Sequence, residues 1–190
     1  MVATGNPGKL REYRELLSGT GLELLAHETG VAETGARYED NAVLKAEAAR
    51  DALGLPALAD DAGIEVEALG GFPGLVSARL APTQPERTSE LLRRLDGISR
   101  PWRARFVCAI AVAEPGRPPT VTAGERWGEV IPEWRGGVGF GYDPIFLVPE
   151  VGRTFGEMEP AEKHAWSHRG AAVRALLETG VLARIASAAH

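Results

Sequence analysis

Two long runs of strand-forming residues, 103–113 and 120–131, constrain the fold of this chain more than any other feature. The segment between them, Glu-Pro-Gly-Arg-Pro-Pro at residues 114–119, is rich in turn formers and cannot continue a strand ladder. We therefore predict an antiparallel hairpin with a long loop. We expect this hairpin to be inserted in a larger mixed sheet.

Helical and extended patterns alternate on both sides of this hairpin. We expect short strands at residues 2–3, 22–26, 57–59, 64–68 and 145–148, with a turn at residues 60–63. We expect helices at residues 8–18, 39–53, 86–95 and 160–179, the last broken near Ser167, and a continuation over residues 181–189. This order predicts an α/β fold with a mixed sheet and flanking helices. A length of 190 residues suits one domain, here 1–190, with two lobes.

Charge and composition exclude several classes of protein. The 21 basic and 26 acidic residues leave a net charge of −5, which argues against a nucleic-acid partner but allows a small anion in one local pocket. The longest apolar run, residues 106–113, is far shorter than the ~20 residues of a membrane helix. The only cysteine, Cys108, lies inside that run and is expected to be a small buried hydrophobe. We expect a cytoplasmic protein with no membrane partner.

The first candidate site is the glycine-rich link TGNPGK at residues 4–9, which joins a strand to a helix. Gly5 and Gly8 allow close backbone approach, and the helix start and Lys9 favour an anion such as a polyphosphate. Leu10 stands where a Walker loop has Ser or Thr for magnesium, so this is a different kind of cradle. The alternative is a plain turn in which Asn6 caps the helix.

The second candidate site is a set of carboxylates. Asp40 falls in the first turn of the second predicted helix, and Asp60 and Asp61 follow a strand. Carboxylates from separate elements suit Mg²⁺, which keeps waters and bridges to phosphates. Because neighbouring residues point to opposite sides, only one of Asp60 and Asp61 is expected to face a ligand. The alternatives are that Asp40 complements the helix dipole and that the Asp pair belongs to an ordinary turn.

The third candidate site lies near the end of the chain. In the segment at residues 139–144, Phe140 could stack on a planar ring and Asp143 could accept hydrogen bonds from ring N–H groups. Lys163 and Arg169, further along, only donate and so select ligands that carry acceptors. The alternatives are core packing for Phe140 and a solvated helix face for the basic stretch.

Together and in this order, these segments resemble the inosine triphosphate pyrophosphatase family, enzymes that act on non-standard purines (dITP, ITP and XTP). The matching segments span nearly the whole chain: TGNPGK (residues 4–9), YEDNAVLKA (38–46), ADDAG (59–63), GGFPGLVSAR (70–79), GFGYDPIF (139–146) and EKHAWSHRG (162–170). The resemblance implies an elongated, two-lobed α/β fold around a cleft, a homodimer, and Mg²⁺-dependent hydrolysis of the triphosphate to the monophosphate and pyrophosphate. Rival interpretations are a pyrophosphatase with another base preference and a nucleotide-binding sensor without catalysis.

The resemblance also implies roles for individual residues. Asp61 would be the general base and a metal ligand, with Asp40 as the second metal ligand. The residues expected to contact the nucleotide are Thr4, Gly5, Asn6, Pro7, Gly8, Lys9, Ala62, Phe140, Gly141, Tyr142, Asp143, Lys163, His168 and Arg169. Two positions depart from the family pattern: Asp40 replaces the usual Glu, and Ala62 replaces a Ser and offers only its backbone N–H.

The enzymatic interpretation depends on one geometric condition. Folding must bring together residues far apart in the sequence, Lys9, Asp61 and Arg169 in particular.

Overall fold

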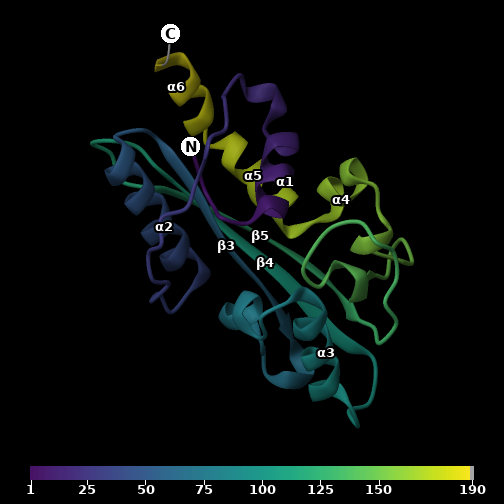
Figure 1. The fold of residues 1–190 in the computed structure, drawn as a ribbon. Coiled ribbons are helices and arrows are strands. Elements are labelled where there is room, and N and C mark those ends of the chain that lie inside the picture. The colour runs from purple at the N-terminus through teal and green to yellow at the C-terminus, as the bar shows by residue number, and fades with distance from the viewer. Residues whose placement is uncertain (189–190) are drawn as a thin grey trace. The chain divides into compact units, whose positions relative to one another are not determined.

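In the computed structural model, which describes residues 1–188, the chain divides into two compact units. Unit 1 contains Met1–Asp61, Cys108–Gly124 and the chain from His168 on, and unit 2 contains Ala62–Val107 and Glu125–Ser167. One seven-stranded sheet has the order β2-β1-β3-β4-β5-β6-β7 (Figure 1). Its three long strands, β3 (Ala57–Val66), β4 (Trp102–Ala113) and β5 (Thr120–Val130), contribute residues to both units.

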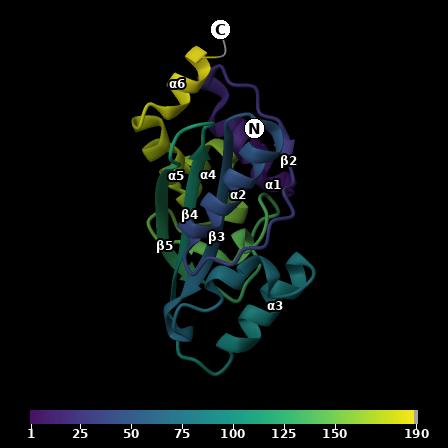
Figure 2. The ribbon, with the colours of Figure 1, turned by 90° about the vertical axis from the view of Figure 1, so that its left-hand side faces the viewer.

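Unit 1 has helices on both faces of its strands. Its other elements are β1 (Val2–Ala3), α1 (Pro7–Leu16), β2 (Ala26–His27), α2 (Tyr38–Leu53), α5 (His168–Glu178) and α6 (Val181–Ala188). The short strand β1 lies between β2 and β3 and pairs in parallel with both. Figures 1 and 2 show α2 on one face of these strands and α1 with α5 on the other. Side chains of β3 therefore meet α2 on one face of the sheet and α1 and α5 on the opposite face.

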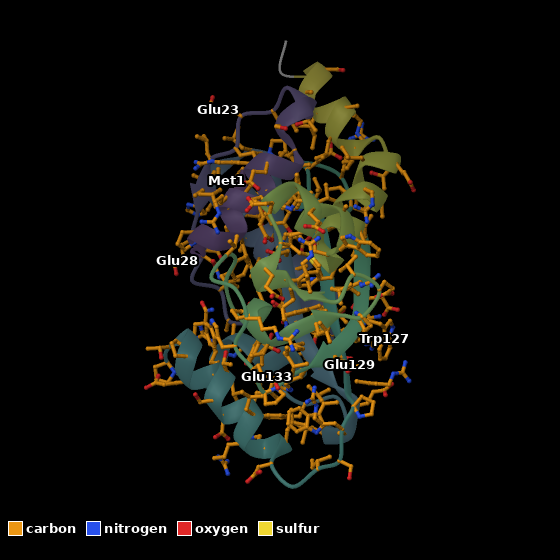
Figure 3. The ribbon with its side chains drawn as sticks, turned by 90° about the vertical axis from the view of Figure 1, so that its right-hand side faces the viewer. Met1, Glu23, Glu28, Trp127, Glu129 and Glu133 are labelled. Atoms are coloured by element: carbon orange, nitrogen blue, oxygen red, sulfur yellow. The ribbon has the colours of Figure 1, made fainter. Side chains whose placement is uncertain are left out.

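Unit 2 is built around an antiparallel part of the sheet. Its further elements are α3 (Gln84–Leu95), β6 (Phe146–Val148), β7 (Arg153–Thr154) and α4 (Pro160–Trp166), and both β5–β6 and β6–β7 are antiparallel. Phe106, Phe146 and Phe155 pack at the centre of its core, with ring centroids 4.7–6.1 Å apart. Among the tryptophans, Trp102 is buried, whereas Trp127, which projects from β5 in Figure 3, is 38% exposed.

Most predicted elements are confirmed. The two strands of the hairpin occupy Trp102–Ala113 and Thr120–Val130, and the last long helix is interrupted at Ser167, whose backbone is extended. On α2, Ala42, Ala46 and Ala49 are buried. Leu53, at the end of the helix, is 41% exposed, because α2 ends there at the left-handed Gly54. Of the predicted continuation over residues 181–189, position 189 lies outside the described residues.

Two predictions about strands are wrong. The strand predicted at residues 22–26 is found only at Ala26–His27, because β1 offers just two residues for pairing, Val2 to Ala26 and Ala3 to His27. The predicted turn at residues 60–63 does not exist, since β3 runs unbroken through Asp60 and Asp61. Within residues 1–188, no helix combines the length and apolar character that crossing a membrane requires.

The aromatic core of unit 2 yields a prediction about stability. Phe155 is fully buried against Phe146 and Phe106, so Phe155→Ala removes a large apolar contact and leaves a cavity. We expect a loss of about 3–5 kcal/mol in the free energy of unfolding, measured from urea denaturation. The control is Glu133→Ala at an exposed position (Figure 3), which should change that free energy by less than about 0.5 kcal/mol. Equal effects of the two substitutions would contradict this assignment of the core.

Candidate active site

Two adjacent carboxylates in the middle of β3 form the centre of the candidate site. Asp60 is 2% exposed and Asp61 is 6% exposed. Successive side chains of a strand point to opposite faces, so the two aspartates meet different helices. Burying a carboxylate is costly unless it is paired or hydrogen-bonded, and each of these carboxylates has such partners on its own face.

Asp60 lies among cations from α1 and α5. Its Oδ2 is 3.1 Å from Lys9 Nζ and 3.0 Å from Arg169 Nη2, and Arg169 also pairs with Glu12 of α1. Burial opposes ionisation of Asp60, but Lys9, Arg169 and Lys45 outweigh it and hold its pKa well below the ordinary value. Asp60 is therefore a permanent negative charge inside a cluster of opposite charges. This arrangement brings the start and the end of the chain together in unit 1.

The amino-terminal loop has the geometry of a helix cap. Asn6 Oδ1 accepts hydrogen bonds from the N–H groups of Gly8 and Lys9, at 2.8 and 3.3 Å, so the capping interpretation is confirmed. Pro7 occupies the first position of α1, where its missing N–H costs nothing. The loop also passes close to Glu28, which Figure 3 labels: a Cβ added at Gly5 would lie 2.9 Å from the Glu28 carboxyl carbon. Lys9, with its side chain 17% exposed, remains the group suited to an anion.

Asp61, on the other face, is held by two residues one turn apart on α2. Its Oδ2 accepts a hydrogen bond of 3.0 Å from Asn41 Nδ2, and its Oδ1 one of 3.4 Å from Lys45 Nζ. Lys45 Nζ also donates to Glu33 Oε1 at 2.7 Å. Burial lowers the pKa of Lys45, but Asp61, Asp60 and Glu33 outweigh that effect and leave the pKa above its ordinary value. Lys45 is thus a stable cation beside Asp61.

Asp40 has a different setting at the start of α2. Both of its carboxylate oxygens accept hydrogen bonds from Arg37, at 2.8 and 3.2 Å. These bonds hold the pKa of Asp40 below its ordinary value, so it is ionised at neutral pH. The pair is exposed, with Arg37 70% accessible, and such surface pairs are weak and easily exchanged for another partner.

The donor set of unit 1 is chemically compatible with magnesium. A phosphate-bound Mg²⁺ typically takes only one or two carboxylates and completes its shell with water and phosphate oxygens. Residues 1–188 contain no cluster of three or more His, Cys, Asp or Glu that would form a complete protein cage. Asp40 and Asp61 provide oxygen donors, and Asn41, the neighbour of Asp40, contacts Asp61 directly. The residues present therefore fit an open Mg²⁺ site.

Unit 2 contains Phe140, Tyr142, Asp143 and Lys163 of the residues that were expected to contact a nucleotide. Asp143 is buried, and its Oδ2 accepts hydrogen bonds from Phe140 N and Lys163 Nζ, each at 2.7 Å. The Lys163 ammonium lies 4.9 Å from the centroid of the Phe140 ring. Tyr142 is also buried, and its hydroxyl donates to the backbone oxygen of Ser77 at 2.9 Å. Asp143 and Tyr142 thus fix the Gly-Phe-Gly loop, whose partly buried Phe140 lies beside Lys163.

The structure distributes the expected site residues over the two units. Unit 1 holds Thr4, Gly5, Asn6, Pro7, Gly8, Lys9, Asp40, Asp61, His168 and Arg169, and unit 2 holds Ala62, Phe140, Gly141, Tyr142, Asp143 and Lys163. Lys9 and Arg169 both contact Asp60. Asp61, the next residue of the strand, contacts Asn41 and Lys45 on the opposite face, so of the three residues in the condition set by the sequence only Lys9 and Arg169 share a partner. Arg169 is 2% exposed and His168 is 5% exposed, more enclosed than the sequence suggested.

Comparisons with known proteins assign this chain to a family. The model of the Ham1 family matches residues 1–179. The chain belongs to the Ham1 family. Relatives named dITP/XTP pyrophosphatase include one from Gloeobacter violaceus, 49% identical over 93% of this chain and 91% of the relative, and one from Thermus thermophilus, 47% identical over 94% and 89%.

Solved structures of Ham1 proteins share the fold. A HAM1 protein from Coxiella burnetii matches with a TM-score of 0.79 and 41% identity, over 92% of this chain and 94% of that one. A nucleoside-triphosphatase / dITP/XTP pyrophosphatase from Mycobacterium abscessus matches with a TM-score of 0.72 and 39% identity, over 92% and 95%. The mixed α/β fold and the family resemblance are thereby confirmed.

Four residues at the centre of this Ham1 site were not singled out by the sequence: Glu12, Glu33, Asn41 and Lys45. Asn41 and Lys45 lie in the matching segment YEDNAVLKA, and their spacing of four residues places them on one helix face, a signal that was available. Glu12 follows Lys9 by three residues on α1, which is a weaker signal of the same kind. Glu33 lies in a loop, where no periodicity indicates its partner.

The only cysteine provides a chemical test of this buried centre. Cys108 Sγ lies 3.7 Å from Asp60 Oδ2, and burial together with the Asp60 charge raises its pKa to about 12. Only about one molecule in 10⁴ would carry the reactive thiolate at pH 8. We expect negligible reaction of the folded protein with Ellman's reagent at pH 8 and one thiol per chain in urea. Rapid stoichiometric labelling of the folded protein would contradict the placement of Cys108.

Proposed function

We propose that this protein hydrolyses the triphosphates of non-standard purines, dITP, ITP and XTP, to the monophosphate and pyrophosphate, with Mg²⁺ as cofactor. The observation that carries the proposal is the setting of Asp61. Asp61 is a buried carboxylate held by Asn41 and Lys45, and the next residue along the chain, Asp60, contacts Lys9 of the glycine-rich loop. The names of the relatives, all dITP/XTP pyrophosphatases, support the same activity.

Asp61 is the general base in this proposal. It accepts a proton from a water molecule that attacks the α-phosphorus, the bond from that phosphorus to its bridging oxygen breaks, and pyrophosphate leaves. Lys9 binds the leaving pyrophosphate by its ammonium group, a favourable contact for developing negative charge. Asp61 and Asp40 would hold Mg²⁺, which when bound supplies positive charge that offsets the charge on the phosphate oxygens. The ion pair between Arg37 and Asp40 is exposed and therefore weak, so Asp40 can exchange Arg37 for the metal ion.

Recognition of the base rests on the oxygen at position six of the purine. Inosine and xanthine carry an acceptor there, whereas adenine carries an amino donor. Donors from His168, Arg169 or a backbone N–H would match the oxygen and oppose the amino group, and such a polar mismatch can give ~10⁴-fold discrimination. Phe140 contributes its ring to stacking.

We further propose that the protein is a cytoplasmic homodimer. The free, buried Cys108 supports a reducing compartment, and the dimer rests on the family resemblance.

A substrate panel tests the function. We expect pyrophosphate release from ITP, dITP and XTP with a kcat/KM at least ~10²-fold above that for ATP, and loss of this activity when EDTA removes Mg²⁺. The measurement is a coupled assay for pyrophosphate, with chromatography to identify the monophosphate product. Comparable rates with ATP would contradict the proposed base preference. Release of orthophosphate instead of pyrophosphate would contradict attack at the α-phosphorus.

Replacement of the proposed base tests the mechanism. Asp61→Asn retains the shape of the side chain but cannot take up the proton, so we expect kcat to fall by ~10²–10⁴-fold or more, with an unchanged circular dichroism spectrum. The matched control is Asp51→Asn, at a carboxylate of α2 whose side chain is 67% exposed, and it should leave kcat unchanged. Near-normal turnover of Asp61→Asn would reject Asp61 as the base.

A further inference from the structure

We infer that Asn41 and Glu33 are positioning residues that fix the orientation of the Asp61 carboxylate. They act from α2 and from the loop that precedes it, and with Gly35 and Lys45 they form what we call the Asp61 brace. The inference rests on the proposed function, because it assigns a purpose to the position of Asp61. All five residues belong to unit 1.

The orientation of the Asn41 amide is determined by its two hydrogen bonds. The N–H of Gly35 donates to Asn41 Oδ1 at 2.7 Å, and a backbone N–H can only donate, so the atom facing it must be the amide oxygen. The amide nitrogen is then turned to Asp61 Oδ2, at 3.0 Å. Asn41 is 1% exposed, and reversing its amide would set two donors against each other. Asn41 thus presents a fixed donor to one oxygen of Asp61.

Glu33 holds the ammonium group of Lys45 in place, as the N–H of Gly35 holds the amide of Asn41. A lysine ammonium ends a flexible four-carbon chain and has no preferred direction of its own. Glu33 Oε1 takes the shorter contact, 2.7 Å, and Asp61 Oδ1 takes the longer one, 3.4 Å. The side chains of Lys45 and Glu33 are 13% and 22% exposed, so solvent screens this pair only in part. Glu33 thereby anchors the ammonium without allowing it to close tightly on Asp61.

The loop can reach α2 only because residue 35 is glycine. A Cβ at Gly35 would lie 2.6 Å from the Asp40 Cβ and 2.8 Å from Asn41 Oδ1, closer than atoms can pack. Any side chain there would push the loop off the helix and remove the donor that orients Asn41. The same approach brings the loop carrying Glu33 within reach of Lys45.

The Asp61 brace affects the proposed reaction by fixing the orientation of the Asp61 carboxylate. Both oxygens of Asp61 accept hydrogen bonds from separate, anchored donors, so the plane of the carboxylate is defined. A general base must lie within hydrogen-bond reach of the proton it takes, and a misplacement of ~1 Å can cost ~10²-fold in rate. Because Asn41 and Glu33 do not themselves hold the substrate in this proposal, their loss should lower kcat and leave KM nearly unchanged.

The test compares kcat and KM for ITP in two variants. Asn41→Asp keeps the acceptor for Gly35 N–H but replaces the donor to Asp61 by a second carboxylate oxygen, which repels the Asp61 carboxylate instead of holding it; we expect kcat to fall ~10²-fold with KM within about twofold of wild type. Glu33→Gln is also isosteric and lies in a partly exposed loop, so it carries the test if Asn41→Asp does not fold; we expect kcat to fall ~10-fold. The control is Glu47→Gln on α2, a partly exposed carboxylate 3.5 Å from Arg50, with wild-type kinetics expected.

A double variant separates positioning from a general structural effect. If Asn41 and Glu33 act through Asp61, then adding Asn41→Asp or Glu33→Gln to Asp61→Asn should lower the residual rate no further. A further fall of the same size as in the single variants would overturn the inference, as would a rise in KM that matches the fall in kcat. Failure of the wild-type protein to release pyrophosphate would overturn the proposed function itself. Full wild-type activity together with unchanged kcat in both single variants would overturn the brace alone.

Discussion

The burial of two neighbouring carboxylates in one strand is the constraint on which unit 1 depends. Asp60 and Asp61 point to opposite faces of β3, and each must find compensating partners on its own face. Breaking a buried charge pair by removing one partner typically costs about 3–5 kcal/mol, a large part of the stability of an ordinary domain. The positions of the helices are therefore restricted. The helices α1 and α5 must lie where Lys9 and Arg169 contact Asp60. The helix α2 must lie where Asn41 and Lys45 contact Asp61.

The two faces compensate their carboxylates differently, and this difference supports Asp61 as the reactive one. Asp60 is enclosed by two cations, and its pKa lies far below the ordinary value, so it has little tendency to take up a proton. Asp61 accepts hydrogen bonds from the neutral amide of Asn41 and from Lys45, which also contacts Glu33. A carboxylate locked among cations serves as a structural charge, which leaves Asp61 as the carboxylate proposed for the reaction.

Sequence patterns predicted the elements whose signals are local. The hairpin strands, the helix α2 and the break at Ser167 follow from periodicity and turn residues in the immediate neighbourhood. The course of β3 could not be predicted in this way, because aspartates and glycine disfavour a strand unless distant side chains compensate them, and those partners lie far away in the sequence. The site shows the same division. Motifs in the sequence single out Lys9, Asp61 and Arg169 as candidates, whereas Glu12 and Glu33 are recognisable only through the cations they contact.

In each unit, a buried polar side chain holds a neighbouring group in place by hydrogen bonds. In unit 1, the buried amide of Asn41 orients Asp61; in unit 2, the buried carboxylate of Asp143 holds Phe140 N and Lys163 Nζ. Sequence reasoning assigned Asp143 to hydrogen bonds with the base, yet its Oδ2 serves the loop, and even a Cβ at Gly139 would lie only 2.3 Å from that oxygen. Polar residues within a motif can therefore orient the side chains that meet a ligand without meeting it themselves.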